Sequence, residues 1–146
     1  MLGAELTSRR QRSLAALAAL ALTAWATPFG VAPSVAAEHS AIAFQTITTE
    51  QLAQMLEHKD FPLVNVHIPY EGEIAQTDAF IPFDQMSNHL DQLPTDKTAA
   101  IVLYCRSGRM SEIAASELAA LGYSNVSHLG GGMIGWEESG YAVLHR

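Results

Sequence analysis

Residues 99–111 read AAIVLYCRSGRMS, an uncharged run that leads into the only cysteine of the chain, Cys105, and then into two arginines. The run from Ala99 to Tyr104 is short and contains β-branched and aromatic residues, which predicts a buried strand. The stretch from Glu112 to Leu121 is rich in Ala, Leu and Glu and is followed by Gly122, which predicts a helix that ends there. The sequence therefore predicts a strand, a tight loop and a helix, with Cys105 at the carboxyl end of the strand.

Cys105 has the predicted surroundings of a reactive thiol. A tight loop before a helix gathers backbone N–H groups, and the helix N-terminus adds partial positive charge. Arg106 and Arg109 lie within a few residues, and such surroundings favour the thiolate, which is the nucleophilic form. A structural cysteine at the end of a buried strand is the alternative. Because the chain has no second cysteine, a dithiol cycle within the chain and a cysteine-rich metal site are both excluded.

The rest of the sequence alternates predicted strands and helices. The predicted strands are 43–47, 62–68, 79–81 and 125–129; the predicted helices are 50–58, 84–93 and 133–138; residues 70–76 are predicted to be an exposed loop. This alternation predicts an α/β fold with a mostly parallel sheet and helices on both faces. Ligands of such sheets bind at the carboxyl ends of the strands, where Cys105 is expected.

Residues 1–37 have the pattern of a signal peptide. Three arginines precede an apolar stretch, and Val35-Ala36-Ala37 places small residues at the expected cleavage site. An uncleaved membrane anchor is the alternative, although prolines and a glycine interrupt the uncharged stretch. We therefore expect one domain, residues 38–146, that is exported to the periplasm or the extracellular space and is free of the membrane after the signal is removed.

The charge of the expected domain is strongly negative. Residues 38–146 hold five Lys or Arg against fourteen Asp or Glu, a net charge of −9. Nucleic acids and anionic membrane surfaces are therefore poor partners. An anionic small substrate would have to be attracted locally, by Arg106, Arg109 and the loop amides.

Three segments of the sequence form a recognisable pattern: Tyr-Cys-Arg-Ser-Gly at 104–108, Leu-Val-Asn-Val at 63–66, and a closing segment at 121–136 that contains Gly131-Gly132 and Trp136. By these segments, residues 44–144 resemble the single-domain rhodanese family of sulfurtransferases. The resemblance implies a rhodanese-like three-layer fold and a ping-pong transfer in which Cys105 takes a sulfane sulfur as a persulfide. The implied substrate-binding residues are Arg106, Ser107, Gly108, Arg109 and Met110.

The same resemblance implies the partners. The donor would be a small sulfur anion such as thiosulfate, bound mainly by the planar guanidinium of Arg106, with Arg109 as the weaker candidate. The acceptor would be cyanide, a thiol or another protein. No metal or organic cofactor is required.

Three positions depart from the family pattern. Asn65 and His67 stand where an Asp-x-Arg strand is usual, and Met110 stands where an arginine is common. The two usual charges of the strand are lost together, which predicts a neutral hydrogen-bonding pair in their place. The family's Gly-His-Ile-Pro-Gly-Ala stretch is hardly recognisable in residues 73–82.

Two other classes of function remain open at this point. A cysteine phosphatase or arsenate reductase needs an arginine six residues after the nucleophile, and that position is Ser111. A non-catalytic rhodanese-like module would bind a partner or sense oxidants through Cys105.

Other residues have plainer interpretations. The six histidines lack metal-ligand spacing, although His67 is expected to end a strand on the Cys105 side. Glu71 and Glu73 are expected to solvate an exposed loop. The three glycines 130–132 are expected to form a tight turn near the active site.

Overall fold

The computed structural model describes residues 43–146, and the predicted signal peptide, residues 1–37, lies outside the described residues. Within residues 43–146 the chain forms a five-stranded sheet and a two-stranded ribbon. The sheet consists, in spatial order, of β1 (Phe44–Ile47), β6 (Val126–Leu129), β5 (Ile101–Tyr104), β2 (Leu63–Asn65) and β4 (Ala79–Phe80). The ribbon pairs β3 (Glu73–Ile74) with β7 (Val143–Leu144), and the helices are α1 (Thr49–Glu57), α2 (Arg109–Ala120) and α3 (Gly132–Glu138).

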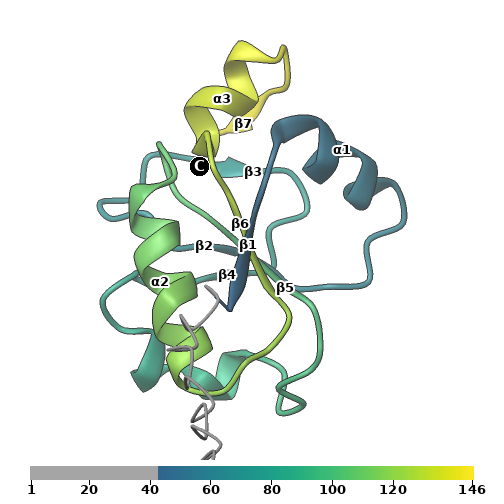
Figure 1. Ribbon diagram of the computed structural model, residues 1–146. Helices are drawn as coiled ribbons and strands as arrows, with labels where there is room; N and C mark the ends of the chain where they lie inside the picture. The colour runs from purple at the N-terminus through teal and green to yellow at the C-terminus, as the bar shows by residue number, and fades with distance from the viewer. Residues whose placement is uncertain (1–42) are drawn as a thin grey trace, which may run out of the picture. The chain divides into compact units, whose positions relative to one another are not determined.

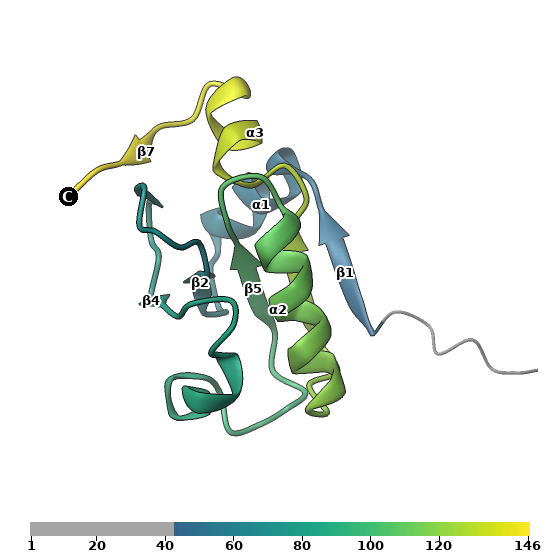
Figure 2. The same cartoon turned by 90° about the vertical axis from the view of Figure 1, so that its left-hand side faces the viewer.

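All neighbouring strands of the five-stranded sheet run parallel. Parallel strands need crossover connections, and the helices that supply them cover both faces of the sheet. Helix α2 packs on one face, whereas α1 and α3 lie on the other (Figures 1 and 2). The α/β class with a parallel sheet between helices is therefore confirmed.

Alternate residues of β5 belong to two separate cores. Ile101, Leu103 and Cys105 pack on the α2 face, whereas Val102 and Tyr104 pack on the α1 face. This alternation is the period of two expected for a strand that is buried on both sides. The side chain of Cys105 therefore emerges toward the N-terminus of α2.

Two helix starts differ in chemistry. Thr48 caps α1, because its hydroxyl accepts from the Gln51 N–H while the Gln51 side chain accepts from the Thr48 N–H. Helix α2 begins at Arg109, three residues before the predicted start, and its N-cap is Gly108 with a φ of 95°. The earlier start brings the first turn of α2 directly against the Cys105 loop.

Residues 84–93 do not form the predicted α-helix. They form two 3₁₀ turns, η1 (Met86–Asn88) and η2 (Leu90–Gln92), separated by His89. Asp, Ser and Asn bond their own backbone and favour turns, and this stretch holds several of them. Met86 and Leu93 are buried on the α2 face, so apolar side chains near both ends hold the segment in place without a regular helix.

The prediction of an exposed loop at 70–76 is wrong for its second half. Glu73 and Ile74 form β3, which pairs with β7 near the end of the chain. Ile74 is fully buried, and Glu73 is 9% exposed. A two-residue strand has no readable periodicity, and its partner lies about 70 residues later, so local pattern could not reveal it.

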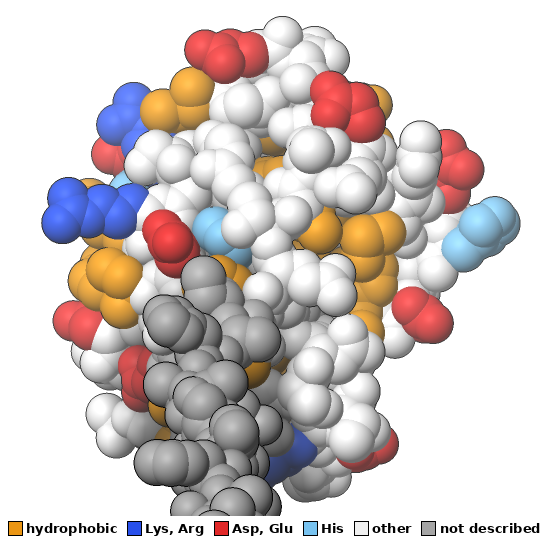
Figure 3. All heavy atoms as spheres, viewed as in Figure 1, with side chains coloured by type: hydrophobic (Ala, Val, Ile, Leu, Met, Phe, Trp, Pro, Cys, Tyr) orange, Lys and Arg blue, Asp and Glu red, His pale blue; other side chains and the backbone are white. Residues whose placement is uncertain are grey.

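One face of the molecule shows how its acidic side chains are distributed. On the face drawn in Figure 3, Asp and Glu side chains are scattered over several elements. Among the described residues, no helix is both long and apolar enough to span a bilayer.

Candidate active site

Cys105 directly follows β5 and is 1% exposed. The amide N–H of Gly108 donates to Cys105 Sγ at 3.1 Å. Gly108 can point its N–H inward because its φ of 95° lies in the left-handed region, which glycine adopts without the penalty of a Cβ. The loop therefore presents a hydrogen-bond donor and the N-terminus of α2 to the sulfur atom.

The glycine turn at 130–132 packs against this loop, as predicted. The N–H of Met133 donates to the Cys105 carbonyl at 2.9 Å, and the N–H of Ile134 donates to the Arg106 carbonyl at 3.0 Å. A Cβ on Gly108 would lie 1.9 Å from the Gly130 carbonyl oxygen. The approach is therefore so close that only a glycine fits at position 108.

Tyr104 fixes the end of β5 from the opposite face. Thr77 donates its hydroxyl proton to the Ile74 carbonyl, so the 2.7 Å contact between hydroxyls is a donation from Tyr104 to Thr77. The Ile74 N–H donates to the Tyr104 oxygen at 3.0 Å. Burial raises the pKa of Tyr104 to about 12, which keeps this donor protonated. The strand that carries Cys105 is thereby tied to β3.

Arg106, the predicted donor anchor, lies in a small charge network. Its Nε is 3.2 Å from Glu71 Oε2, and the same oxygen is 3.3 Å from Nε2 of His67. The Arg106 side chain is 55% exposed, whereas that of His67 is 9% exposed. Glu71 is the only acidic partner of Arg106 in residues 43–146. Glu71 is exposed, as expected, and in addition it pairs with Arg106, which the sequence did not predict.

The predicted neutral pair between Asn65 and His67 does not form between side chains. The Asn65 amide oxygen accepts from the backbone N–H of His67 at 3.0 Å, and its Nδ2 donates to the Gly72 carbonyl at 2.9 Å. The ring nitrogens of His67 make no well-aligned hydrogen bond within the described chain, and the ring faces Glu71 instead. The side chain of Asn65 thus holds the backbone of the segment after β2 in place, while the ring of His67 contacts Glu71.

The remaining loop residues lie at different depths. Ser107 and Arg109 are exposed, and Met110 is half-buried against the core on the α2 face. Arg109 forms no ion pair in the described part of the chain, with Glu112 or with any other acid. Arg106 is therefore the arginine that the structure connects to neighbouring functional groups.

Three residues of the site region make contacts that the sequence did not predict. Glu73 pairs with Tyr70 and Arg146, which ties the end of the chain to the segment after β2. His128 and Ser111 meet behind the Cys105 loop, with Nδ1 and Oγ 3.2 Å apart. The serine was considered only as a missing arginine, and a histidine in a short strand gave no sign of its partner.

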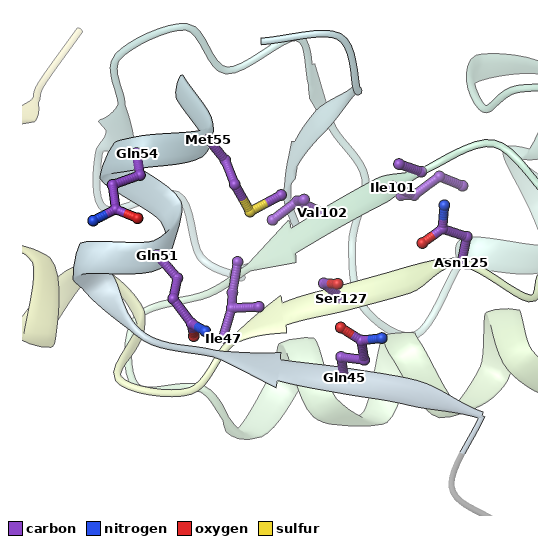
Figure 4. Close-up of a pocket in the computed structure, with 10 residues that line it drawn as sticks. Gln45, Ile47, Gln51, Gln54, Met55, Ile101, Val102, Asn125 and Ser127 are labelled. Atoms are coloured by element: carbon purple, nitrogen blue, oxygen red, sulfur yellow. The ribbon is translucent and has the colours of Figure 1, made fainter. Parts of the chain in front are cut away.

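A small cavity lies beside Arg106, and a larger groove lies elsewhere on the molecule. A cavity of about 150 Å³ adjoins Arg106 and is lined also by Glu71, Glu137 and His145. A groove of about 460 Å³ lies beside α1 over β1, β6 and β5 (Figure 4). The groove is lined by uncharged side chains, including Gln51, so it lacks the chemistry of the Cys105 loop. No cluster of His, Cys, Asp and Glu in residues 43–146 could hold a metal ion.

Comparison with known proteins gives a consistent result. Residues 48–139 match the family described as Rhodanese-like domain. A protein of Allochromatium vinosum named Sulfurtransferase is 35% identical over 103 residues, which cover 67% of this chain and 92% of that protein. A Mycobacterium tuberculosis protein named Probable adenylyltransferase/sulfurtransferase MoeZ is 34% identical over 98 residues, which cover 64% of this chain but 24% of that protein.

A solved structure agrees with these sequence relatives. The crystal structure of a rhodanese-related protein from Thermoplasma volcanium has a TM-score of 0.57 and 26% identity, and it covers 68% of this chain and 97% of that one. The match over residues 48–139 spans more than half of the sequence and includes the Cys105 loop. The chain therefore belongs to the rhodanese-like domain family.

Proposed function

We propose that this protein is a sulfurtransferase that moves a sulfane sulfur from a donor such as thiosulfate to a nucleophilic acceptor through a persulfide on Cys105. The observation that carries the proposal is the donation from the Gly108 N–H to Cys105 Sγ at the end of β5. The names of the relatives and the family match support sulfur transfer in general. Thiosulfate is proposed because Arg106, which follows the nucleophile in the sequence, offers a guanidinium that suits an oxyanion.

In the first half-reaction, the Cys105 thiolate attacks the outer sulfur of thiosulfate. The sulfur–sulfur bond of the donor breaks, sulfite leaves with the bonding electron pair, and Cys105 carries a persulfide anion. In the second half-reaction, an acceptor such as cyanide attacks the outer sulfur. Thiocyanate leaves, and the thiolate of Cys105 is restored, so atoms and charges balance without a cofactor.

The buried position of Cys105 suits such a shuttle. A persulfide places its outer sulfur about 2 Å beyond Sγ, which is the length of a sulfur–sulfur bond. Because Cys105 is 1% exposed, the outer sulfur is the atom that an acceptor meets first. The charge on that sulfur is then stabilised by the loop amides and the N-terminus of α2.

The phosphatase alternative lacks its essential group. Position 111 holds a buried serine that donates to the Gly108 carbonyl, so no guanidinium stands six residues after the nucleophile. A binding or redox-sensing module would keep Cys105 without turnover, and the same experiment distinguishes it. We also propose that the protein acts after export, because residues 1–37 have the pattern of a signal peptide.

The test is the intact mass of the natively processed protein before and after thiosulfate. We expect one added sulfur, about 32 Da, and its removal by cyanide with release of thiocyanate. Cys105→Ser should abolish both steps with an unchanged melting temperature, because the substitution is nearly isosteric. A wild-type protein that takes up no sulfur from any sulfane donor, or one that still carries Arg9 and Arg10 after native processing, would contradict the corresponding proposal.

A further inference from the structure

A chain of hydrogen bonds leads from β1 to the Cys105 loop through His128, a residue of β6 that the sulfur-transfer reaction does not use. His128 is 3% exposed. Its Nε2 lies 2.9 Å from Oγ1 of Thr46, and its Nδ1 lies 3.2 Å from Oγ of Ser111. Ser111 Oγ in turn lies 2.9 Å from the carbonyl oxygen of Gly108. The chain therefore ends on the same residue whose N–H contacts Cys105 Sγ.

The direction of each bond follows from the donors available. The Gly108 carbonyl can only accept, so the single hydroxyl proton of Ser111 is donated to it. His128 must then donate its Nδ1–H to Ser111 Oγ. A neutral ring has an acceptor at the other nitrogen, which takes the hydroxyl proton of Thr46. Every member of the chain is thereby satisfied with one tautomer of a neutral histidine.

The groups packed around His128 are consistent with a neutral ring. Burial lowers the pKa of His128, and the opposing effects of the Glu112 charge and the Gly108 carbonyl are smaller. The Phe44 ring packs edge-on at 5.5 Å between centroids. Two uncharged residues of β1, Phe44 and Thr46, contact the imidazole on one side, and Ser111 of the first turn of α2 contacts it on the other.

The series of hydrogen bonds ends at Gly108, the residue of the loop that has no side chain to restrict its backbone angles. Gly108 has wide backbone freedom in principle, and a single helical bond from the Glu112 N–H holds its carbonyl otherwise. A second bond from Ser111, whose hydroxyl is oriented by His128, further fixes the direction of that carbonyl. We propose that His128 is a positioning residue that acts through Ser111 to hold the Gly108 amide in line with Cys105 Sγ. The inference rests on the proposed function for its role in turnover, but the geometry of Cys105 can be measured without turnover.

Two substitutions of His128 separate positioning from simple burial. The side-chain nitrogen of asparagine lies near the place of Nδ1, so His128→Asn keeps a donor to Ser111 and loses the contact with Thr46. Glutamine reaches the place of Nε2, so His128→Gln keeps the contact with Thr46 and loses the donor to Ser111. Both variants bury a neutral amide, and a purely structural role would affect them equally. Ser111→Ala breaks the inner link, between His128 and Ser111, as His128→Gln does. Thr46→Val breaks the outer link, between His128 and Thr46, as His128→Asn does.

Two rates are measured for each variant: alkylation of Cys105 by iodoacetamide, and thiosulfate-to-cyanide transfer resolved into kcat and KM. His128→Gln and Ser111→Ala should slow alkylation and lower kcat about tenfold with KM unchanged, the value of one hydrogen bond. His128→Asn and Thr46→Val should stay within about threefold of the wild type. Equal rates for the inner-link and outer-link variants would overturn the inference. If the wild type transfers no sulfur while alkylation still separates the two pairs, the proposed function fails and the positioning role stands.

Discussion

The two sides of the site are held together by different kinds of contact. The loop at 105–110 is fixed by backbone groups: the Gly108 N–H on Sγ, two amides of α3 on the carbonyls of Cys105 and Arg106, and a close approach to Gly130. The segment at 65–74 is fixed by side chains: the Asn65 amide, the Glu71 carboxylate and Glu73. Backbone contacts leave almost no choice of residue, whereas side-chain contacts can be exchanged in pairs. The difference agrees with a family pattern that is intact at residues 104–108, where the backbone contacts lie, and altered at Asn65 and His67.

Gly108→Ala should give the largest effect, because it disrupts the backbone contacts that fix the loop at 105–110. The new Cβ would meet the Gly130 carbonyl oxygen at 1.9 Å, in addition to the strain of a positive φ. We expect persulfide formation to be lost and the free energy of unfolding to fall by more than about 3 kcal/mol, the strain of a left-handed residue plus a backbone displacement. Chemical denaturation and intact mass are the measurements.

Gly140→Ala is the matched control, since Gly140 has a φ of 89° and its Cβ would meet nothing within 4 Å. It should lower the free energy of unfolding by about 1 kcal/mol and leave sulfur transfer unchanged. If the two variants behave alike, the close approach of Gly130 to the loop is not what fixes position 108.

The same difference between regions decides what could be predicted from the sequence. The strand, loop and helix around Cys105, and the glycine turn beside it, follow from local signals: a short apolar run, glycines at turns and an Ala-rich helix. The order of the parallel strands then places Cys105 at the functional edge of the sheet.

The segment after β2 could not be predicted in the same way. Glu71 contacts Arg106 across 35 positions of sequence, and β3 pairs with a strand near the end of the chain. The helix expected at 84–93 does not form, because two 3₁₀ turns already bury the apolar residues Met86 and Leu93. Such contacts depend on which elements the fold brings together, and no local pattern records them.

Asn65→Asp, alone and together with His67→Arg, tests whether the two departures from the usual Asp-x-Arg strand depend on each other. The new carboxylate oxygen would face the Gly72 carbonyl that Asn65 Nδ2 now approaches to 2.9 Å, and two acceptors repel. We expect the free energy of unfolding to fall by about 1–3 kcal/mol, the cost of a lost buried hydrogen bond. Adding His67→Arg should recover part of this loss, because a guanidinium beside the new carboxylate restores a pair of charges.

The control for this double-mutant cycle is Asn125→Asp. Asn125 also donates through Nδ2 to a backbone carbonyl, that of Thr98 at 3.3 Å, but this contact is exposed. Its replacement should cost less than about 0.5 kcal/mol. Strictly additive effects of Asn65→Asp and His67→Arg in chemical denaturation would show that the two departures from the family pattern are independent.

The smallest expected effects concern the charge network at Arg106. Arg106→Ala should raise the KM for thiosulfate about fivefold, near 1 kcal/mol, because the side chain is half-exposed and its charge is screened by solvent. Arg109→Ala should raise it less, since Arg109 is not connected to Glu71 or His67. Glu71→Gln should have the opposite sign and lower the KM about twofold. Its amide oxygen can still accept from Arg106 Nε, while one negative charge that repels the dianionic donor is removed.

Steady-state kinetics at two salt concentrations check these signs. Added salt should shrink the effect of Glu71→Gln, because exposed charges are screened within a Debye length of about 8–10 Å near physiological ionic strength. Glu57→Gln, at the end of α1 and without an ion pair among residues 43–146, is the control for the overall net charge. A KM that rises in Glu71→Gln would mean that Glu71 serves mainly to orient Arg106. A KM that falls equally in Glu57→Gln would mean that donor affinity depends on the net charge of the whole molecule and not on the local charge of Glu71 beside Arg106.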